Sequence, residues 1–300
     1  MTKPILLIFS VLAVASSFCV YAQEDGTSIA ERLQRLNADT TWRQVERIPV
    51  QFDTFHPQGM AVVGERLFIS SVEVIDRRKS EGKGHLFECD MAGKLLRQIR
   101  LEEDAVYHPG GIDFDGRYLW VPVAEYRSDS RAVVFRVDPK SMNAVRVFEF
   151  ADHLGGILRD GKSNALIANS WGSRRFYRWS MTEGAPSDPK SPMVRANPSH
   201  YVDYQDGQWL RGTNLMLCGG LRGYRVPGRG KGTFPLGGVG LIETDTLDVV
   251  HEIPIPIWTE GGGAMTQNPF YATATEEGLR FYFMPEDNES TIYVYEPVIR

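Results

Sequence analysis

The sequence predicts an all-β protein, a β-propeller of about five four-stranded blades, with six blades as the alternative. The first observation is a recurring motif, in which a histidine precedes glycine and then an apolar residue; it begins at His56, His108 and His153 and, more loosely, at His200. The second observation is the spacing, since the successive steps are 52, 45 and 47 residues (108 − 56, 153 − 108 and 200 − 153). Periods of roughly 40–50 residues are typical of a propeller blade.

Each copy of the motif continues in the same order. A turn signal follows the motif; in the fourth copy it is Asp206-Gly207. An apolar strand comes next; these strands are Leu67–Ser71, Tyr118–Pro122, Ala165–Asn169 and, in the fourth copy, Asn214–Cys218. An alternating segment then ends in a turn residue; these segments are His85–Asp90, Val133–Asp138, Arg175–Ser180, Val239–Thr244 and Thr291–Glu296. Short alternating runs bounded by turn residues indicate β-strands.

The last copy predicts how the ring closes. This fifth copy begins at Gly261–Met265, lacks the histidine and ends after three strands. Its missing strand is expected from the other end of the sequence, because Arg43–Val50 resembles Val249–Pro256, the outer strand of the fourth copy. An N-terminal strand that completes the last blade would cover two sheet edges.

The first residues are typical of a secretory signal peptide. Lys3 precedes an apolar run, and Val20-Tyr21-Ala22 predicts cleavage after about Ala22. We expect a signal peptide over 1–22, a leader with a short helix over 23–41 and a single propeller domain over 42–300. The helix is expected from Ser28 to Leu36, because Ser28 and Glu31 have the spacing of a capping box. The product is expected to be periplasmic or secreted and monomeric, and not to associate with a membrane after cleavage.

Charge and cysteine content narrow the function classes. The net charge of −5 argues against nucleic acid as a partner. The charge of residues 222–231 differs from that of the whole chain, because this segment carries four basic residues and no acidic one. They lie in an expected long loop over 219–238, where Arg222 and Arg225 would favour an anionic small molecule; the alternative is a solvated loop. Cys89 and Cys218 are expected to be buried free thiols rather than a disulfide.

The four histidines are expected to converge near the axis, on the face that also carries the loops between second and third strands. Convergent imidazoles suit a metal ion, a general base or a polar ligand, and the alternative is that they only fix turns. The candidate catalytic residues are His56, His108 and Glu73. The candidate ligand-binding residues are His153, His200, Asn169, Trp171, Asn214, Arg222 and Arg225.

Family resemblances agree with the propeller prediction. The runs His56–Met60, Ser70–Val74 and His108–Ile112 resemble an uncharacterised family of secreted propeller proteins. More distantly, the blade pattern resembles the lactonase and strictosidine-synthase-like propellers, some of which are Ca²⁺-dependent hydrolases, with Asn169 and Asn214 as comparable amides. It also resembles the five-bladed glutaminyl-cyclotransferase propellers, whose opening motif is similar to Gln58–Met60.

The sequence contains no Gly-x-Ser-x-Gly, His-Glu-x-x-His or Cys-x-x-Cys motif. We therefore expect a propeller whose central, histidine-ringed pocket binds a small anionic ligand. The alternative is a hydrolase of lactonase or esterase type that uses the same pocket, assisted by a divalent metal ion. Whether the protein is an enzyme, and whether it binds a metal, stays open at the level of sequence.

Overall fold

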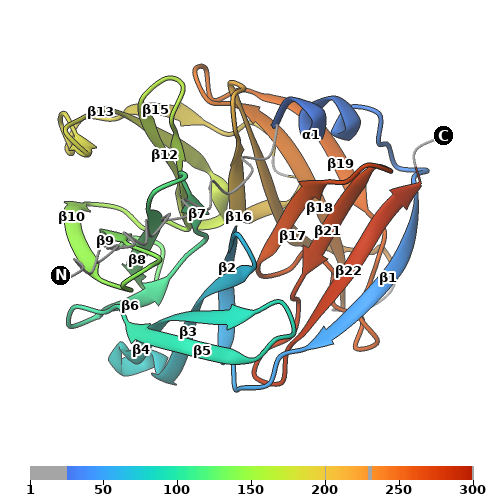
Figure 1. Cartoon of the computed structure of the whole chain (residues 1–300), viewed down its shortest axis with the longest axis horizontal. Coiled ribbons are helices and arrows are strands. Elements are labelled where there is room, and N and C mark those ends of the chain that lie inside the picture. The colour runs from blue at the N-terminus through green and yellow to red at the C-terminus, as the bar shows by residue number, and fades with distance from the viewer. Residues whose placement is uncertain (1–25, 200, 229–231, 299–300) are drawn as a thin grey trace, which may run out of the picture.

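Five four-stranded blades form a ring in the computed structural model, which describes residues 26–199, 201–228 and 232–298 (Figure 1). All strand pairs within the blades are antiparallel. The prediction of an all-β propeller with five blades is confirmed.

Each blade begins with its innermost strand. Blade one contains β2 (His56–Val63), β3 (Arg66–Asp76), β4 (Glu81–Asp90) and β5 (Leu95–Arg100). In blade two, β6 (Val106–Pro109) and β7 (Asp113–Phe114) both pair with β8 (Leu119–Glu125), which is followed by β9 (Ala132–Val137) and β10 (Ala144–Phe150). Blade three contains β11 (Gly156–Asp160), β12 (Ala165–Asn169), β13 (Arg175–Thr182) and β15 (Met193–Ala196), with β14 (Ala185–Pro186) as an extension of β13.

The last two blades complete the ring. Blade four contains β16 (Asp203–Leu210), β17 (Leu215–Arg225), β18 (Thr233–Glu243) and β19 (Val249–Ile255). Blade five contains β20 (Phe270–Ala274), β21 (Leu279–Phe283), β22 (Thr291–Val298) and β1 (Thr41–Pro49). Two short 3₁₀ turns, η1 (Arg77–Lys79) and η2 (Trp171–Ser173), lie between second and third strands of blades one and three.

The core lies between neighbouring blades. In β8, for example, Leu119, Val121 and Val123 pack in the cluster shared with blade one, whereas Trp120 and Ala124 pack in the cluster shared with blade three. Side chains of a strand alternate between its two faces. Because both faces of a middle strand are covered by other blades, such a strand is apolar along its whole length, as the sequence of β8 shows.

The ring closes as the sequence predicts. Strand β1 pairs with β22 in antiparallel register, with Arg43 opposite Glu296 and Ile48 opposite Ile292. The guanidinium of Arg43 lies 2.7 Å from the Glu296 carboxylate, and Ile48 is buried. The N-terminal strand thereby covers the outer edge of blade five.

Two details of the fourth and fifth copies differ from the sequence prediction. The expected turn at Asp206-Gly207 lies inside β16, and the true turn follows Leu210, so Asn214 lies at the opposite end of the blade from the histidines. The innermost strand of blade five begins at Phe270 rather than near Gly261, because Ala264 and its neighbours form a covering loop outside the strands. The alternation of polar and apolar residues does not show whether a residue such as Asp206 lies in a turn or lies in a strand and hydrogen-bonds to neighbouring blades.

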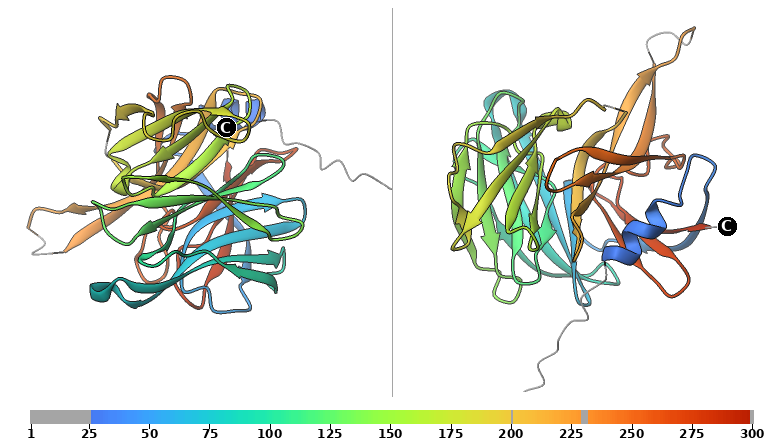
Figure 2. Two further views of the ribbon diagram at one scale, coloured as in Figure 1. Left: turned by 90° about the vertical axis from the view of Figure 1, so that its left-hand side faces the viewer. Right: turned by 90° about the horizontal axis from the view of Figure 1, so that it is seen from above.

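The expected long loop over 219–238 is mostly a projecting β-hairpin. Strands β17 and β18 stay in register out to Arg225 opposite Thr233. Figure 2 shows this hairpin extending from one side of the ring, while the helix α1 (Gly26–Leu33) lies on the other side.

The helix α1 covers the ring between blades four and five. It begins two residues before the expected Ser28 and ends before the expected Leu36. Ile29 and Leu33 are buried in the core cluster of these two blades. The N–H of Gly26 donates to the Arg211 carbonyl, with 3.1 Å between nitrogen and oxygen.

A buried carboxylate, that of Asp206 on β16, lies at the axis of the ring. It accepts backbone N–H groups from Met60 (2.9 Å), Ile112 (3.1 Å) and Phe270 (3.2 Å), which belong to blades one, two and five. Burial raises the pKa of Asp206, and these N–H donors oppose the increase. A second axial carboxylate, Asp113, accepts N–H groups of Arg159 and Trp209.

The glycine of the repeated motif makes this convergence possible. A Cβ at Gly111 would lie 2.6 Å from the Gln205 carbonyl oxygen, and one at Gly59 would lie 2.6 Å from the Ile112 nitrogen. Contacts of this length do not occur for real side chains, so the innermost strands can approach the axis only where glycine stands.

Replacing Asp206 is expected to destabilise the ring as a whole. Asp206→Ala leaves three buried N–H donors from three blades without an acceptor, and each such donor costs about 1–3 kcal/mol. We expect a decrease of roughly 3–5 kcal/mol in the free energy of unfolding, measured by guanidinium denaturation. The exposed carboxylate of Asp129 provides the control Asp129→Ala, which should change the stability little. Equal stability of the two variants would contradict the role of Asp206.

Asp113 is expected to make stability depend on pH. Burial raises the pKa of Asp113 to about 7 in the folded protein, while the positive charge of Arg211 acts in the opposite direction. The folded state therefore holds the proton more tightly than the unfolded chain, and stability falls as the pH rises from about 4 to about 7. Asp113→Asn removes this part of the decrease, so its unfolding free energy should vary less with pH than that of the parent. An unchanged pH profile would show that Asp113 does not titrate in this range.

Candidate functional site

The two faces of the ring carry different residues. We name them the histidine face, which carries His56, η1, η2 and the β17–β18 hairpin, and the cavity face, which carries α1 and the turn after Leu210. The backbone and side-chain contacts around Asp206 lie between them.

On the histidine face, blades two and three contribute to one aromatic cluster. His108 stacks on Tyr126 with 4.1 Å between ring centroids and lies 5.7 Å from His153. Trp171 of η2 contacts the edge of His153 at 4.7 Å. The structure thus brings together His108, His153 and Trp171, as expected, and adds Tyr126.

Both central imidazoles of this cluster are neutral at pH 7. Burial, together with the neighbouring His153 and His56, lowers the pKa of His108 well below its ordinary value. Burial also lowers the pKa of His153 to about 4, although the Glu125 carbonyl, 3.1 Å from its Nδ1, opposes this. A base with such a low pKa is a poor proton acceptor at neutral pH.

The other expected catalytic residues do not join this cluster. Nδ1 of His56 lies 2.8 Å from the Asp287 carboxylate, and its Nε2 lies 2.9 Å from the Gln58 amide, so both ring nitrogens are occupied. Glu73 lies 3.0 Å from the Lys83 ammonium and 3.4 Å from His85 instead. His56 and Glu73 are thus engaged with Asp287, Gln58, Lys83 and His85 rather than with His108 or His153.

The remaining expected ligand-binding residues have structural partners or lie apart. The Asn169 amide donates to the Tyr204 carbonyl at 3.1 Å and connects blades three and four. Asn214 is on the cavity face, Arg222 and Arg225 are on the hairpin, and His200 lies outside the described residues. Within the described part of the chain, no three His, Cys, Asp or Glu side chains are arranged to hold a metal ion.

The two cysteines of the ring are buried and unpaired, as expected. None of the described helices has the length and apolar character needed to cross a bilayer.

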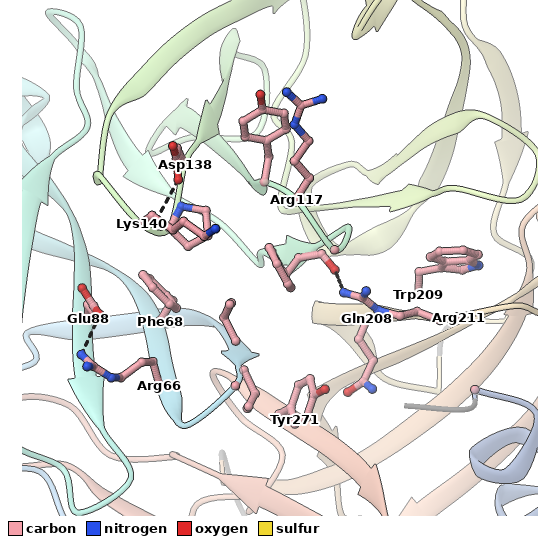
Figure 3. A pocket seen from close by; sticks show the side chains of 18 of the residues that line it. Arg66, Phe68, Glu88, Arg117, Asp138, Lys140, Gln208, Trp209, Arg211 and Tyr271 are labelled. Carbon is pink, nitrogen blue, oxygen red and sulfur yellow. Dashed lines mark hydrogen bonds and ion pairs between the residues drawn. The ribbon is translucent and has the colours of Figure 1, made fainter. Parts of the chain in front are cut away.

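A cavity of about 930 Å³ opens on the cavity face (Figure 3). Volumes of about 300–1,000 Å³ are typical of small-molecule sites. Its walls come from the ends of innermost strands β2, β7, β16 and β20 and from the turns that follow several of them, with α1 at one side. The cavity therefore lies where four blades meet.

Positive charge dominates the cavity wall. Five basic and two acidic residues line it, a balance of +3 (5 − 2) in a chain whose net charge is −5; they are Arg66, Arg97, Arg117, Lys140, Arg211, Glu88 and Asp138. The buried Glu88 carboxylate is shared by two of the arginines, Arg66 at 3.0 Å and Arg97 at 2.5 Å. Asp138 accepts the backbone N–H of Lys140 at 2.8 Å and so fixes the turn that carries this lysine.

Three cations of the wall are left without a carboxylate partner. Among the described residues, Arg117, Lys140 and Arg211 form no ion pair. The Arg211 guanidinium donates to the Phe114 carbonyl and lies 5.2 Å from the centre of the Phe114 ring. Figure 3 shows the Arg211 guanidinium beside Trp209, with Arg117 across the cavity.

Aromatic side chains form part of the remaining lining, including Phe68, Tyr118, Trp209 and Tyr271. The Trp209 indole donates to the Thr213 carbonyl at 3.2 Å, and its ring is mostly buried. The cavity thus offers apolar rings beside unpaired cations, which suits an organic anion better than a free metal ion or a neutral lipid.

Sequence reasoning missed these cavity residues. Arg117 and Lys140 lie in short turns that are marked only by Asp115-Gly116 and Asp138-Pro139, and Arg211 lies in the turn whose position was wrong. The repeat itself points to Arg117 and Arg211, because in a propeller the turns that follow the first strand of each blade lie on one face.

Comparison with solved structures finds matches of low sequence identity. The Malassezia sympodialis allergen Mala s 1 matches with a TM-score of 0.46 and 11% identity, over 80% of this chain and 78% of that one. The Penicillium chrysogenum α-L-arabinanase complexed with arabinobiose gives 0.49 and 7%, over 85% and 98%. The β-propeller domain of the Trilobed protease from Pyrococcus furiosus gives 0.35 and 13%, over 82% and 70%.

At such identities and TM-scores, these similarities carry no inference about ligand or activity. No curated protein matches the chain. The sequence model of one family matches residues 11–300, nearly the whole chain. The chain therefore belongs to the family of unknown function DUF6454.

Proposed function

We propose that the protein binds a small organic anion in the cavity on the cavity face. One observation carries the proposal: Arg117, Lys140 and Arg211 line a cavity of about 930 Å³ and have no carboxylate partner among the described residues. Unpaired cations in one concave wall repel one another, and a bound carboxylate or phosphate would relieve this repulsion.

The aromatic lining favours a ligand with a flat or apolar part. Phe68 is fully buried, while Tyr118 and Tyr271 are half-buried and present ring surface to the cavity. Rings of this kind bind apolar or ring-shaped groups, and an arginine can pair with a carboxylate or phosphate in bidentate geometry. The proposed ligand therefore combines an anionic head with a ring or apolar body.

The histidine face supports this function less well. His108 and His153 are buried under aromatic rings, and low pKa values remove their charge at neutral pH. The expected anionic ligand is kept in the proposal, but its binding site is placed on the opposite face. No observation favours the hydrolase alternative.

Matched charged and neutral probes test the proposal. We expect phenyl phosphate and benzoate to bind in isothermal titration calorimetry, and the neutral isostere benzamide to bind at least tenfold more weakly, because only the anions pair with the cations. Arg211→Gln and Arg117→Gln should each weaken phenyl phosphate binding by about tenfold, which corresponds to about 1.4 kcal/mol.

The control Arg225→Gln removes the same charge on the opposite face and should leave this affinity unchanged. The proposal is wrong if neither anion binds, or if Arg211→Gln and Arg117→Gln both bind phenyl phosphate as tightly as the parent protein does. Thermal unfolding of each variant shows whether it is folded.

We also propose that the protein acts outside the cytoplasm, supported by the positive start, apolar run and small residues before position 23. Expression of the full sequence in a bacterial host should then yield a product that begins at Gln23, as read by N-terminal sequencing of the periplasmic fraction. A Val20→Phe/Ala22→Phe variant should block this processing. A product that keeps Met1 in the cytoplasm would contradict export.

A further inference from the structure

The hairpin on the histidine face extends beyond the other strands of its blade, as the β3–β4 pair also does in blade one. The last residue of β17 that pairs with β16 is Leu221, and the last residue of β18 that pairs with β19 is Gly237. Beyond them, Arg222–Arg225 and Thr233–Leu236 pair only with each other. This segment is a two-stranded ribbon that projects from its blade (Figure 2).

An isolated two-stranded ribbon is at best marginally stable in water. Here it is held by its register and by two contacts at its base. The Tyr224 hydroxyl donates to the Tyr201 carbonyl, and the Trp258 indole donates to the Pro235 carbonyl at 2.8 Å. The ribbon is therefore positioned by the ring, although it buries little apolar surface itself.

Aromatic side chains lie exposed on this ribbon and beside it. Tyr224, Phe234 and Trp258 are 36%, 40% and 37% exposed, and the rings of Phe234 and Trp258 are in contact at 5.3 Å. The contacting rings of Phe234, on the ribbon, and Trp258, beside it, form a local exposed apolar patch.

The described part of the ribbon also carries positive charge, at Arg222 and Arg225. The sequence from 221 to 237 contains four basic residues and no acidic residue, in a chain of net charge −5. The Arg225 side chain is exposed and, among the described residues, has no ion pair, and the nearby Glu260 instead faces Arg47 at 3.6 Å. The ribbon is thus a local basic site on an acidic protein.

We propose that this ribbon, defined by residues 222–225 and 233–236 together with Trp258, docks the protein onto a bilayer that contains anionic lipids. Basic side chains near a surface are attracted to anionic headgroups, and Trp and Tyr favour the interface between headgroups and hydrocarbon. The interaction is peripheral and needs no membrane-spanning segment.

A lipid surface fits this ribbon better than a folded protein partner. Specific protein interfaces bury about 800 Å² on each side. Two strands about 5 Å apart are too narrow to supply such a surface, whereas insertion of a few rings into a headgroup layer needs only the tip of a ribbon. The net charge of the rest of the chain would turn the ribbon toward an anionic surface.

Vesicle sedimentation tests this proposal independently of ligand binding in the cavity. We expect the protein to sediment with phosphatidylcholine vesicles that contain 30% phosphatidylglycerol, and at least tenfold less with pure phosphatidylcholine. Arg225→Glu and Phe234→Ser should each reduce binding to the anionic vesicles at least tenfold. All variants carry the same N-terminal sequence, so any contribution from that segment is constant.

Two control variants test whether vesicle binding depends on the ribbon itself rather than on the overall charge or on any exposed apolar side chain. Lys162→Glu makes the same change in charge on the cavity face, and Val145→Ser removes an exposed apolar side chain from β10. Both should bind like the parent protein.

The proposal is overturned if anionic and neutral vesicles bind equally, if Arg225→Glu and Phe234→Ser keep full binding, or if Lys162→Glu loses as much binding as Arg225→Glu. Stronger binding to immobilised polyglutamate than to the anionic vesicles would assign the ribbon to acidic proteins and would likewise overturn it.

Discussion

The Asp206 carboxylate is the interaction on which the rest of this ring depends. It accepts backbone N–H groups from three other blades in a region without water-exposed polar groups. A buried carboxylate is tolerated only when it is well hydrogen-bonded, so the four blades involved must keep their relative positions. Blade three is joined separately, through the parallel contact between Gly111 and Gly156. The innermost strands thus form a single hydrogen-bonded layer around the axis, and the outer strands are built on it.

A filled axis has a consequence for function, because it separates the two faces of the ring. Side chains on one face do not reach ligands on the other, and each face is free to carry its own chemistry. The histidine face holds buried neutral imidazoles and a basic aromatic ribbon, whereas the cavity face holds space and unpaired cations. A cavity at the end of the innermost strands also rests on the most rigid layer of the molecule, which favours a preformed site over one that must be ordered by its ligand.

Much of the fold could be predicted from the sequence, but the site could not. Periodicity fixed the blade count, and the similarity between Arg43–Val50 and an outer strand predicted closure. The repeated histidine motif indicated function. Its recurrence along the chain nevertheless has a steric explanation, because Gly59 and Gly111 allow the innermost strands to approach one another closely at the axis. The turn assigned to Asp206-Gly207 was wrong because a carboxylate in a strand can satisfy distant N–H groups, a role that no local pattern reveals. Arg117, Lys140 and Arg211 were missed because only the three-dimensional ring brings their turns together.

Closure by β1 has a consequence for biosynthesis. The partner of this strand, β22, begins at residue 291, so 241 residues (290 − 49) separate the end of one from the start of the other. At about 5–20 residues per second, a ribosome needs roughly 10–50 s to make that stretch. During this interval the nascent chain presents an unpaired N-terminal strand and an incomplete ring whose edges are open to other chains. Closure of the ring in this protein can therefore begin only after β22 has been synthesised, because β1 has no other partner strand among the described residues.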